Sequence, residues 1–144
     1  MRLSEIILLV TLICAGCSVK PEPLNYGTDM CQTCKMTLID SKFGGEVVTR
    51  KGKVYKFDDL NCMVNFLNSE FLNNAEIAHR LVIDYSRPGK LIDATQAFYL
   101  KSPEIRSPMA GSIAAFEFEA DKDAYKKQWG AIYLTWGEVV AQFK

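Results

Sequence analysis

The chain has 144 residues, and its 17 basic and 17 acidic side chains give a formal net charge of zero at pH 7. Lysine and arginine never cluster beyond a pair, whereas nucleic-acid binding requires a concentrated basic surface. We therefore exclude nucleic acid as a partner. The length suits one small globular unit, or two half-sized modules, around a modest core.

The N-terminus has the pattern of an export signal. Arg2 precedes an apolar run at residues 6–13, which is far shorter than the roughly 20 apolar residues that a membrane-spanning helix needs. Residues 13–17 (ICAGC) resemble the lipobox of bacterial lipoproteins, with Cys14 standing where leucine is usual. We expect residues 1–16 to be a lipoprotein signal peptide.

Cys17 follows this signal and is the residue that we expect to carry the lipid anchor. Residues 17–26 contain two prolines and few apolar side chains, which predicts a flexible linker rather than packed structure. The residue after Cys17 is Ser18, whereas an aspartate at this position would indicate retention in the inner membrane. We expect a lipid-anchored protein on the periplasmic side of the envelope, at the outer membrane.

The remaining chain predicts an α+β fold of two ββαβ modules with antiparallel hairpins, at about residues 27–90 and 91–144 within one domain of residues 27–144. In the first module we expect strands at 46–49 and 54–57 around a turn at 50–53, a helix with Asp58 as its N-cap, and a strand at 80–85. In the second we expect strands at 96–100 and 113–118, a helix at 121–129, a strand at 131–134 and a final helix at 136–143.

Sulfur atoms concentrate in one segment. The pattern Cys31-x-x-Cys34-x-Met36 adds a thioether to a pair of thiols, and in extended backbone Cys34 and Met36 share a face. Such soft donors favour Cu(I) over Zn(II), and no imidazole or carboxylate cluster accompanies them. Met109, in a turn between a proline and a glycine, is a further candidate ligand.

Two more side chains are reserve ligands. Cys62 is expected on the first helix, where burial in the core is the ordinary role of a cysteine. His79 is the only histidine, and we expect it in a turn before a strand, as a surface or capping residue.

Three motifs in this order, residues 29–36 (DMCQTCKM), 57–59 (FDD) and 107–109 (SPM), resemble the NosL family over essentially the whole exported chain. The resemblance implies a lipoprotein that binds Cu(I) and supplies it for the copper centres of nitrous oxide reductase. It also implies a domain pair similar to part of organomercurial lyase, and a chaperone rather than an enzyme.

Carried over by motif, the resemblance assigns Cu(I) binding most strongly to Cys34 and Met36, then to Cys31 and Met109. Its implied partners are a copper donor, either a transporter or a carrier, and the recipient copper enzyme.

Three other functions compete with copper delivery. A thiol-disulfide oxidoreductase would use Cys31 and Cys34, but such a motif is expected between a strand and a helix of a βαβ unit. A structural zinc site would combine these two cysteines with Cys62 and His79. A lyase-like enzyme, with Asp58 or Asp59 as its acid, rests on kinship of fold alone.

Overall fold

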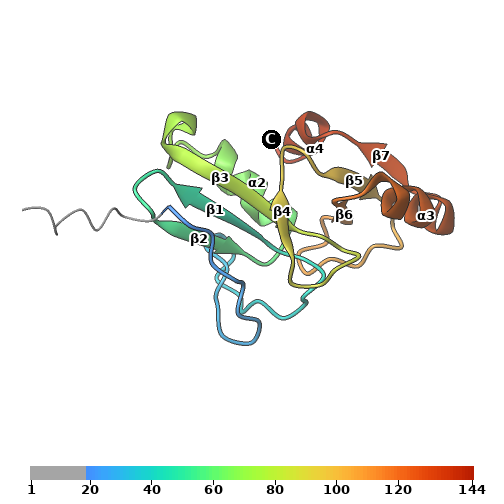
Figure 1. The fold of residues 1–144 in the computed structure, drawn as a ribbon, viewed down its shortest axis with the longest axis horizontal. Coiled ribbons are helices and arrows are strands. Elements are labelled where there is room, and N and C mark those ends of the chain that lie inside the picture. Colours follow the sequence, from blue (N-terminus) through green and yellow to red (C-terminus); the bar gives the residue numbers. More distant parts are fainter. Residues whose placement is uncertain (1–18) are drawn as a thin grey trace, which may run out of the picture.

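The computed structural model describes residues 19–144, so the predicted signal peptide and Cys17 lie outside the described residues. Two antiparallel sheets lie side by side, each with helices packed on it (Figure 1). This confirms the α+β class and the ββαβ order of both modules. No helix in this part of the chain is long and apolar enough to cross a bilayer.

The first sheet has the strand order β2-β1-β3-β4. The predicted hairpin is confirmed as β1 (Gly45–Thr49) and β2 (Val54–Phe57), with Gly52 in the left-handed region at φ 83° to close the turn. All five residues of β1 are buried, because this strand lies between β2 and β3 and is covered by a helix.

The covering helix is α2 (Leu60–Asn68), which is amphipathic and directs Leu60, Met63 and Val64 into the core. Its N-cap is Asp59, so the prediction that Asp58 caps this helix is wrong. Asp59 makes no capping hydrogen bond with its side chain. The carboxylates of Asp58 and Asp59 instead contact other parts of the molecule, and these contacts belong to the site described below.

A short 3-10 helix, η1 (Asn74–Glu76), leads into β3 (Ile77–Ile83), which begins before the predicted strand at 80–85. Pairing with the full length of β1 extends β3, so that His79 lies inside the strand opposite Val48. The prediction that His79 stands in a turn is therefore wrong. An unpredicted strand, β4 (Leu91–Asp93), pairs with β3 and carries the first sheet past residue 90.

The second sheet has the strand order β6-β5-β7. Its elements are the strands β5 (Phe98–Lys101), β6 (Ile113–Phe116) and β7 (Ile132–Leu134), and the helices α3 (Glu119–Trp129) and α4 (Trp136–Gln142). Each lies close to its predicted position. Gly130, in the left-handed region at φ 58°, ends α3.

The two modules share one core. Buried residues of the first module pack in the same cluster as Tyr99, Ile113 and Val139 of the second. A backbone hydrogen bond also joins the two modules, in which the Tyr85 N–H donates to the Ala115 oxygen at 2.8 Å. Strand β6 is thereby held next to the segment that follows β3.

Residues 19–26 contain no helix or strand, but the chain is attached to the first sheet from Glu22 onward. Leu24 is buried in the core, and the Glu22 N–H donates to the buried Glu46 carboxylate at 3.0 Å. Lys56 on β2 forms ion pairs with Glu22 and Asp29. The polypeptide is thus fixed to the hairpin from Glu22 onward.

Candidate metal centre

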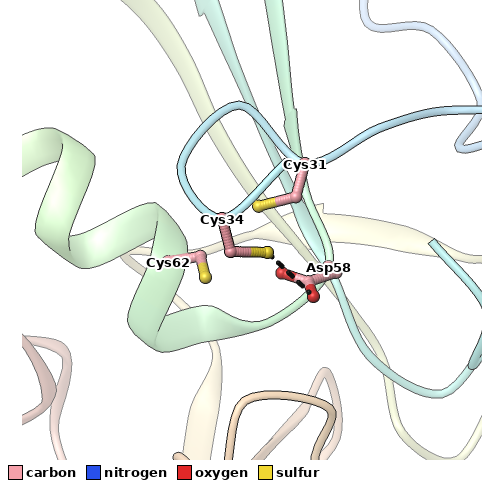
Figure 2. Close-up of side chains that lie close together, drawn as sticks. All are labelled: Cys31, Cys34, Asp58 and Cys62. Atoms are coloured by element: carbon pink, nitrogen blue, oxygen red, sulfur yellow. Dashed lines mark hydrogen bonds between the residues drawn. The ribbon is translucent and has the colours of Figure 1, made fainter. Parts of the chain in front are cut away.

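Four potential metal ligands meet where a loop, the end of β2 and the start of α2 come together (Figure 2). The sulfur atoms of Cys31, Cys34 and Cys62 and a carboxylate oxygen of Asp58 all lie within 4.8 Å of one another. The three thiols are free, and all four side chains point toward a common centre. Convergent thiols and a carboxylate form a donor set suited to a metal ion.

The loop that carries Cys31 and Cys34 is a tight turn. The Cys31 N–H donates to the Met36 oxygen at 2.8 Å, and the Lys35 N–H donates to the Cys31 oxygen at 3.0 Å. Lys35 has φ 64°, in the left-handed region, so the backbone reverses here. The extended backbone expected between Cys34 and Met36 is wrong, and the Met36 side chain is 53% exposed.

Two hydrogen bonds attach this turn to the elements that carry the other ligands. The Gln32 N–H donates to the Lys56 oxygen of β2 at 2.8 Å, just before Asp58. The Thr33 hydroxyl donates to the backbone oxygen of Cys62 on α2, also at 2.8 Å. The relative positions of all four ligands are therefore fixed by the fold, which lowers the ordering cost of binding an ion.

Access to the cluster is one-sided. Cys31, Asp58 and Cys62 are only 1%, 4% and 3% exposed, whereas Cys34 is partly exposed. An ion that enters or leaves must pass Cys34. This arrangement combines a shielded site with a single accessible sulfur atom.

The thiols differ in their affinity for protons. A hydrogen bond from the Cys62 thiol lowers the pKa of Cys31 to about 6, and backbone N–H groups near its sulfur act in the same direction. The pKa of Cys62 is correspondingly raised, first by its bond to Cys31 and then by burial. Burial also raises the pKa of Cys34, although the Met36 N–H opposes this. Of the three thiols, Cys31 is therefore the one that loses its proton most readily.

Asp58 is the member of the cluster that the sequence interpretation missed as a ligand. The Cys34 thiol donates to its Oδ2 at 3.4 Å, and its buried Oδ1 has no hydrogen-bond partner. A signal was present in the sequence, because Asp58 follows a predicted strand and precedes Cys62 by about one helical turn. Without the observed turn at Cys34, that spacing had no partner to indicate a site.

Asp59, next in the chain, faces the second module. Its Oδ2 accepts hydrogen bonds from the Ser107 hydroxyl at 2.6 Å and from the Met109 N–H at 2.8 Å. The Asn61 amide donates to the Met109 oxygen at 2.8 Å. The Met109 backbone is thus hydrogen-bonded to Asp59 and Asn61. These two residues lie in the chain between Asp58 and Cys62 of the cluster. Met109 itself is partly buried against the shared core.

The structure brings some of the predicted ligands together and leaves His79 apart. It brings Cys31 and Cys34 together with Cys62. The role expected for Cys62 from the sequence is burial in the core, and the structure adds a place in the cluster. His79 is not a member of this cluster, so the zinc site predicted from three cysteines and His79 lacks its fourth ligand. Asp58 occupies that fourth position instead.

Comparison with known proteins gives this site a family context. A sequence model of the NosL family matches residues 25–143, and no curated protein matches the chain. The crystal structure of the copper chaperone NosL from Shewanella denitrificans is similar, with a TM-score of 0.70 and 21% identity over 84% of this chain and 96% of that one. That likeness shows a common fold. Because the family match spans most of its length, the chain belongs to the NosL family.

Proposed function

We propose that this protein is a copper chaperone that holds Cu(I) on the thiolates of Cys31, Cys34 and Cys62 and delivers it to nitrous oxide reductase. The observation that carries the proposal is the convergence of three thiols of which only one, Cys34, is accessible. A carrier must shield its ion in transit and still expose a ligand through which a partner can take it over.

The chemistry of the donor set supports Cu(I) as the cargo. Thiolates are soft ligands, and Cu(I) accepts the low coordination number that three sulfur atoms provide. The described relative from Shewanella denitrificans is itself a copper chaperone, which supports the same class of cargo for this chain. Nitrous oxide reductase as the recipient follows from the resemblance of the motifs and is the finer part of the proposal.

Two methionines lie on segments that adjoin the cluster. Met36 is exposed directly after the turn that carries Cys34, and Met109 is held at the start of α2. We assign Met36 to the entry and exit of the ion and Met109 to a weaker, supporting contact. Thioethers bind Cu(I) without needing to lose a proton, so they suit a step of exchange.

A thiol-disulfide oxidoreductase fits this geometry less well. Redox-active Cys-x-x-Cys motifs place a nucleophilic thiol at a helix N-terminus, where it is partially exposed. Here Cys31, whose pKa is lowered, is buried, and the motif lies in a turn without a helix. Substrate disulfides would meet Cys34 first, and its pKa is raised.

The location of the protein is also a proposal. We infer lipidation at Cys17 and attachment to the periplasmic face of the outer membrane, from the export pattern in the sequence. Cells that carry Cys17→Ser should leave the protein unprocessed and detached from membranes, as measured by fractionation and palmitate labelling. Processing that is unchanged in this variant would refute the lipid anchor.

Competition with a Cu(I) chelator tests the copper proposal. Cys34→Ser and Met36→Leu should each weaken Cu(I) binding markedly, and Met109→Leu should weaken it less. Leucine nearly conserves the volume of methionine, so any loss reports the missing thioether rather than packing. X-ray absorption of the Cu(I) form should show a shell of few sulfur atoms.

Delivery is tested in cells that also produce the reductase. Cys34→Ser should leave the reductase polypeptide at its normal level but poor in copper. Full Cu(I) binding by the purified Cys34→Ser protein would show that the site is placed wrongly. A fully loaded reductase in cells whose only copy is this variant would refute delivery while leaving metal binding intact.

A further inference from the structure

We propose that the turn between β1 and β2, with the aromatic side chains beside it, lies on the surface of an anionic phospholipid bilayer. This turn, residues 50–53, is called the hairpin tip below. The inference rests on the proposed lipid anchor at Cys17 and is independent of copper binding. It concerns the end of the first sheet where β2 begins, whereas the metal centre adjoins the residue that follows the end of β2.

The N-terminal segment runs along β1 toward the hairpin tip. Leu24 lies against Gly44, where an added Cβ would come within 2.9 Å of Leu24 Cδ1. Glu22 donates its N–H to Glu46, two residues further along the strand. Going back from Leu24 toward Cys17, the chain therefore approaches the hairpin tip. Figure 1 agrees, because the first described residues lie at the end of the first sheet where β1 passes into β2.

The proposed anchor keeps this end of the first module close to the membrane. Cys17 precedes Glu22, the residue from which the chain is fixed to the hairpin, by five residues. Five residues span at most about 18 Å when fully extended. A lipid on Cys17 therefore holds the hairpin within about that distance of the bilayer surface. Lys20, between the two in the chain, adds a cation to this short connection.

The hairpin tip carries a local excess of positive charge. Arg50, Lys51 and Lys53 are exposed and line one hollow, and among its other lining residues Glu76 alone is acidic. Within residues 19–144, none of these three cations forms an ion pair. The chain as a whole has no net charge, so the excess is local. Each Lys or Arg near an anionic bilayer strengthens binding roughly fivefold.

Apolar surface lies directly beside these cations. The hollow has a volume of about 410 Å³ and a mainly apolar lining that includes Tyr55 and Leu72. Phe71 is 60% exposed, and its ring packs at right angles on Tyr55 with centroids 5.9 Å apart. Apolar and aromatic side chains flanked by Lys and Arg are typical of protein surfaces that lie in a bilayer interface.

The cations and the apolar side chains form one preformed surface. The Arg50 Nε–H donates to the Ala75 oxygen at 2.8 Å, and the Arg50 backbone N–H donates to the Glu76 oxygen at 2.7 Å. These bonds attach η1 to the hairpin tip. The Lys53 ammonium lies 4.9 Å from the centroid of the Tyr55 ring. Little ordering is therefore required when the surface meets its partner.

A bilayer fits this surface better than a protein partner does. The exposed charge of the hairpin tip is of one sign and faces the end of the molecule from which the anchor leaves. Because the anchor is covalent, contact with the bilayer is an intramolecular step at high effective concentration. A protein partner would have to compete with that contact for the same residues.

The test uses the full mature protein with its lipid, free of metal and reconstituted into vesicles of phosphatidylcholine and phosphatidylglycerol. Phe71→Trp places a fluorescent probe beside the hairpin tip. Phe118→Trp places the matched probe at a position of the second module that is 52% exposed. Brominated acyl chains should quench the Phe71→Trp probe several-fold more than the Phe118→Trp probe, after subtraction of the wild-type tryptophan signal. Equal quenching of the two probes would overturn the proposal.

Removal of charge tests the role of the cations. Lys51→Gln combined with Lys53→Gln, in the Phe71→Trp protein, should lower the ratio of bilayer-bound to free hairpin tips roughly 25-fold, at roughly fivefold for each cation. Lys126→Gln combined with Lys127→Gln removes the same charge from exposed positions of α3, at the opposite end of the molecule, and should leave quenching unchanged (Figure 1). High salt should act like the hairpin variant. Full quenching by the hairpin variant, or in phosphatidylcholine alone, would refute recognition of anionic lipid.

The outcomes separate this inference from the other proposals. Mass spectrometry of the purified protein shows whether Cys17 carries lipid, and its absence would refute the anchor together with this inference. Lipidated protein without excess quenching of the Phe71→Trp probe would refute this inference alone. A response of that probe to envelope proteins but not to vesicles would assign the surface to a protein partner and overturn the proposal. Cu(I) affinity, measured by chelator competition, should be unchanged in the hairpin variant.

Discussion

The two modules place an acidic residue at the same point of their shared order, one position before the N-cap of the first helix. In the second module this residue is Glu117, which forms ion pairs with Lys90 at 2.5 Å and with Arg87 at 2.7 Å. In the first it is Asp58, which forms no ion pair within residues 19–144 and faces three thiols. One position is neutralised by the protein itself, and the other belongs to the candidate metal site.

The surroundings of Glu117 and Asp58 differ as well, because aromatic rings pack beside the helix that follows Glu117, whereas Asp58 is left with a polar atom without a partner. The second module packs a cluster of aromatic rings beside α3, in which Tyr125 and Trp129 have centroids 4.6 Å apart. Such packing is complete without a ligand. The first module instead leaves Oδ1 of Asp58 unpartnered within its cluster. We therefore expect a bound ion to stabilise the shared fold through the Asp58 cluster, whereas the packing of the aromatic cluster needs no ligand.

The strongest way to break this comparison is to remove a thiol from the first module. Cys62→Ser should lower Cu(I) affinity by at least roughly 10–100-fold, because a hydroxyl replaces one of three soft ligands at nearly constant volume. Chelator competition measures the change. Tyr125→Phe, which alters the second module without removing its ring, should bind Cu(I) like the wild type. Equal losses in both variants would show that the thiol matters only for folding.

Lowering the pH tests whether protons compete with the metal ion for the thiolates of the first module. Because the pKa values of Cys34 and Cys62 are raised, an ion that binds both displaces their protons, and affinity should rise with pH by roughly tenfold per unit for each proton displaced. Below about 6, Cys31 also becomes protonated, so the fall in affinity should steepen there. Chelator competition across this range, with proton release measured by calorimetry, gives the slope. A flat profile would exclude thiolate ligands.

The bridge between the modules is tested by a change in stability. Asp59→Ala removes the acceptor for the Ser107 hydroxyl and the Met109 N–H and should lower the free energy of unfolding by about 2–3 kcal/mol. Asp59→Asn keeps an acceptor oxygen and should cost less. Denaturant unfolding of the metal-free proteins measures both. A loss of Cu(I) affinity in Asp59→Ala that Met109→Leu does not share would show that more than the Met109 contact depends on this bridge.

Most of the fold could be predicted because its signals are local. The β-rich runs on either side of Gly52 and the apolar stripe of α2 are patterns of residues close together in the chain, and both elements lie where these patterns predict them. β4 and the early start of β3 were missed, because each is specified by pairing with another strand, β3 and β1 respectively, and not by a pattern in its own residues. His79 was misplaced for the same reason.

The site was predicted only as far as its ligands are neighbours in the chain. Cys31 and Cys34 form a recognisable motif, but their meeting with Cys62 depends on a left-handed Lys35 and on two hydrogen bonds across the fold. Asp58 was interpreted as a helix cap, since a carboxylate before a helix ordinarily has that role. The carboxylate that faces the thiols was therefore identified only from the three-dimensional arrangement.

The smallest expected effect comes from the second module's own acidic residue. Hydrogen bonding to Lys90, followed by the charges of Lys90 and Arg87, lowers the pKa of Glu117 below its usual 4.5. A lowered pKa means that the folded protein favours the ionised form, so this stabilisation is present above pH 4.5 and is lost as the pH falls through the lowered value. Glu117→Gln should therefore reduce the melting temperature slightly at neutral pH and low salt. High salt should remove the difference between the two proteins, because the ion pairs of Glu117 are partly exposed and screened. Metal affinity should not change in either buffer. A drop in Cu(I) affinity in Glu117→Gln would show that the two acidic positions are coupled through the shared core, and would end their interpretation as independent positions.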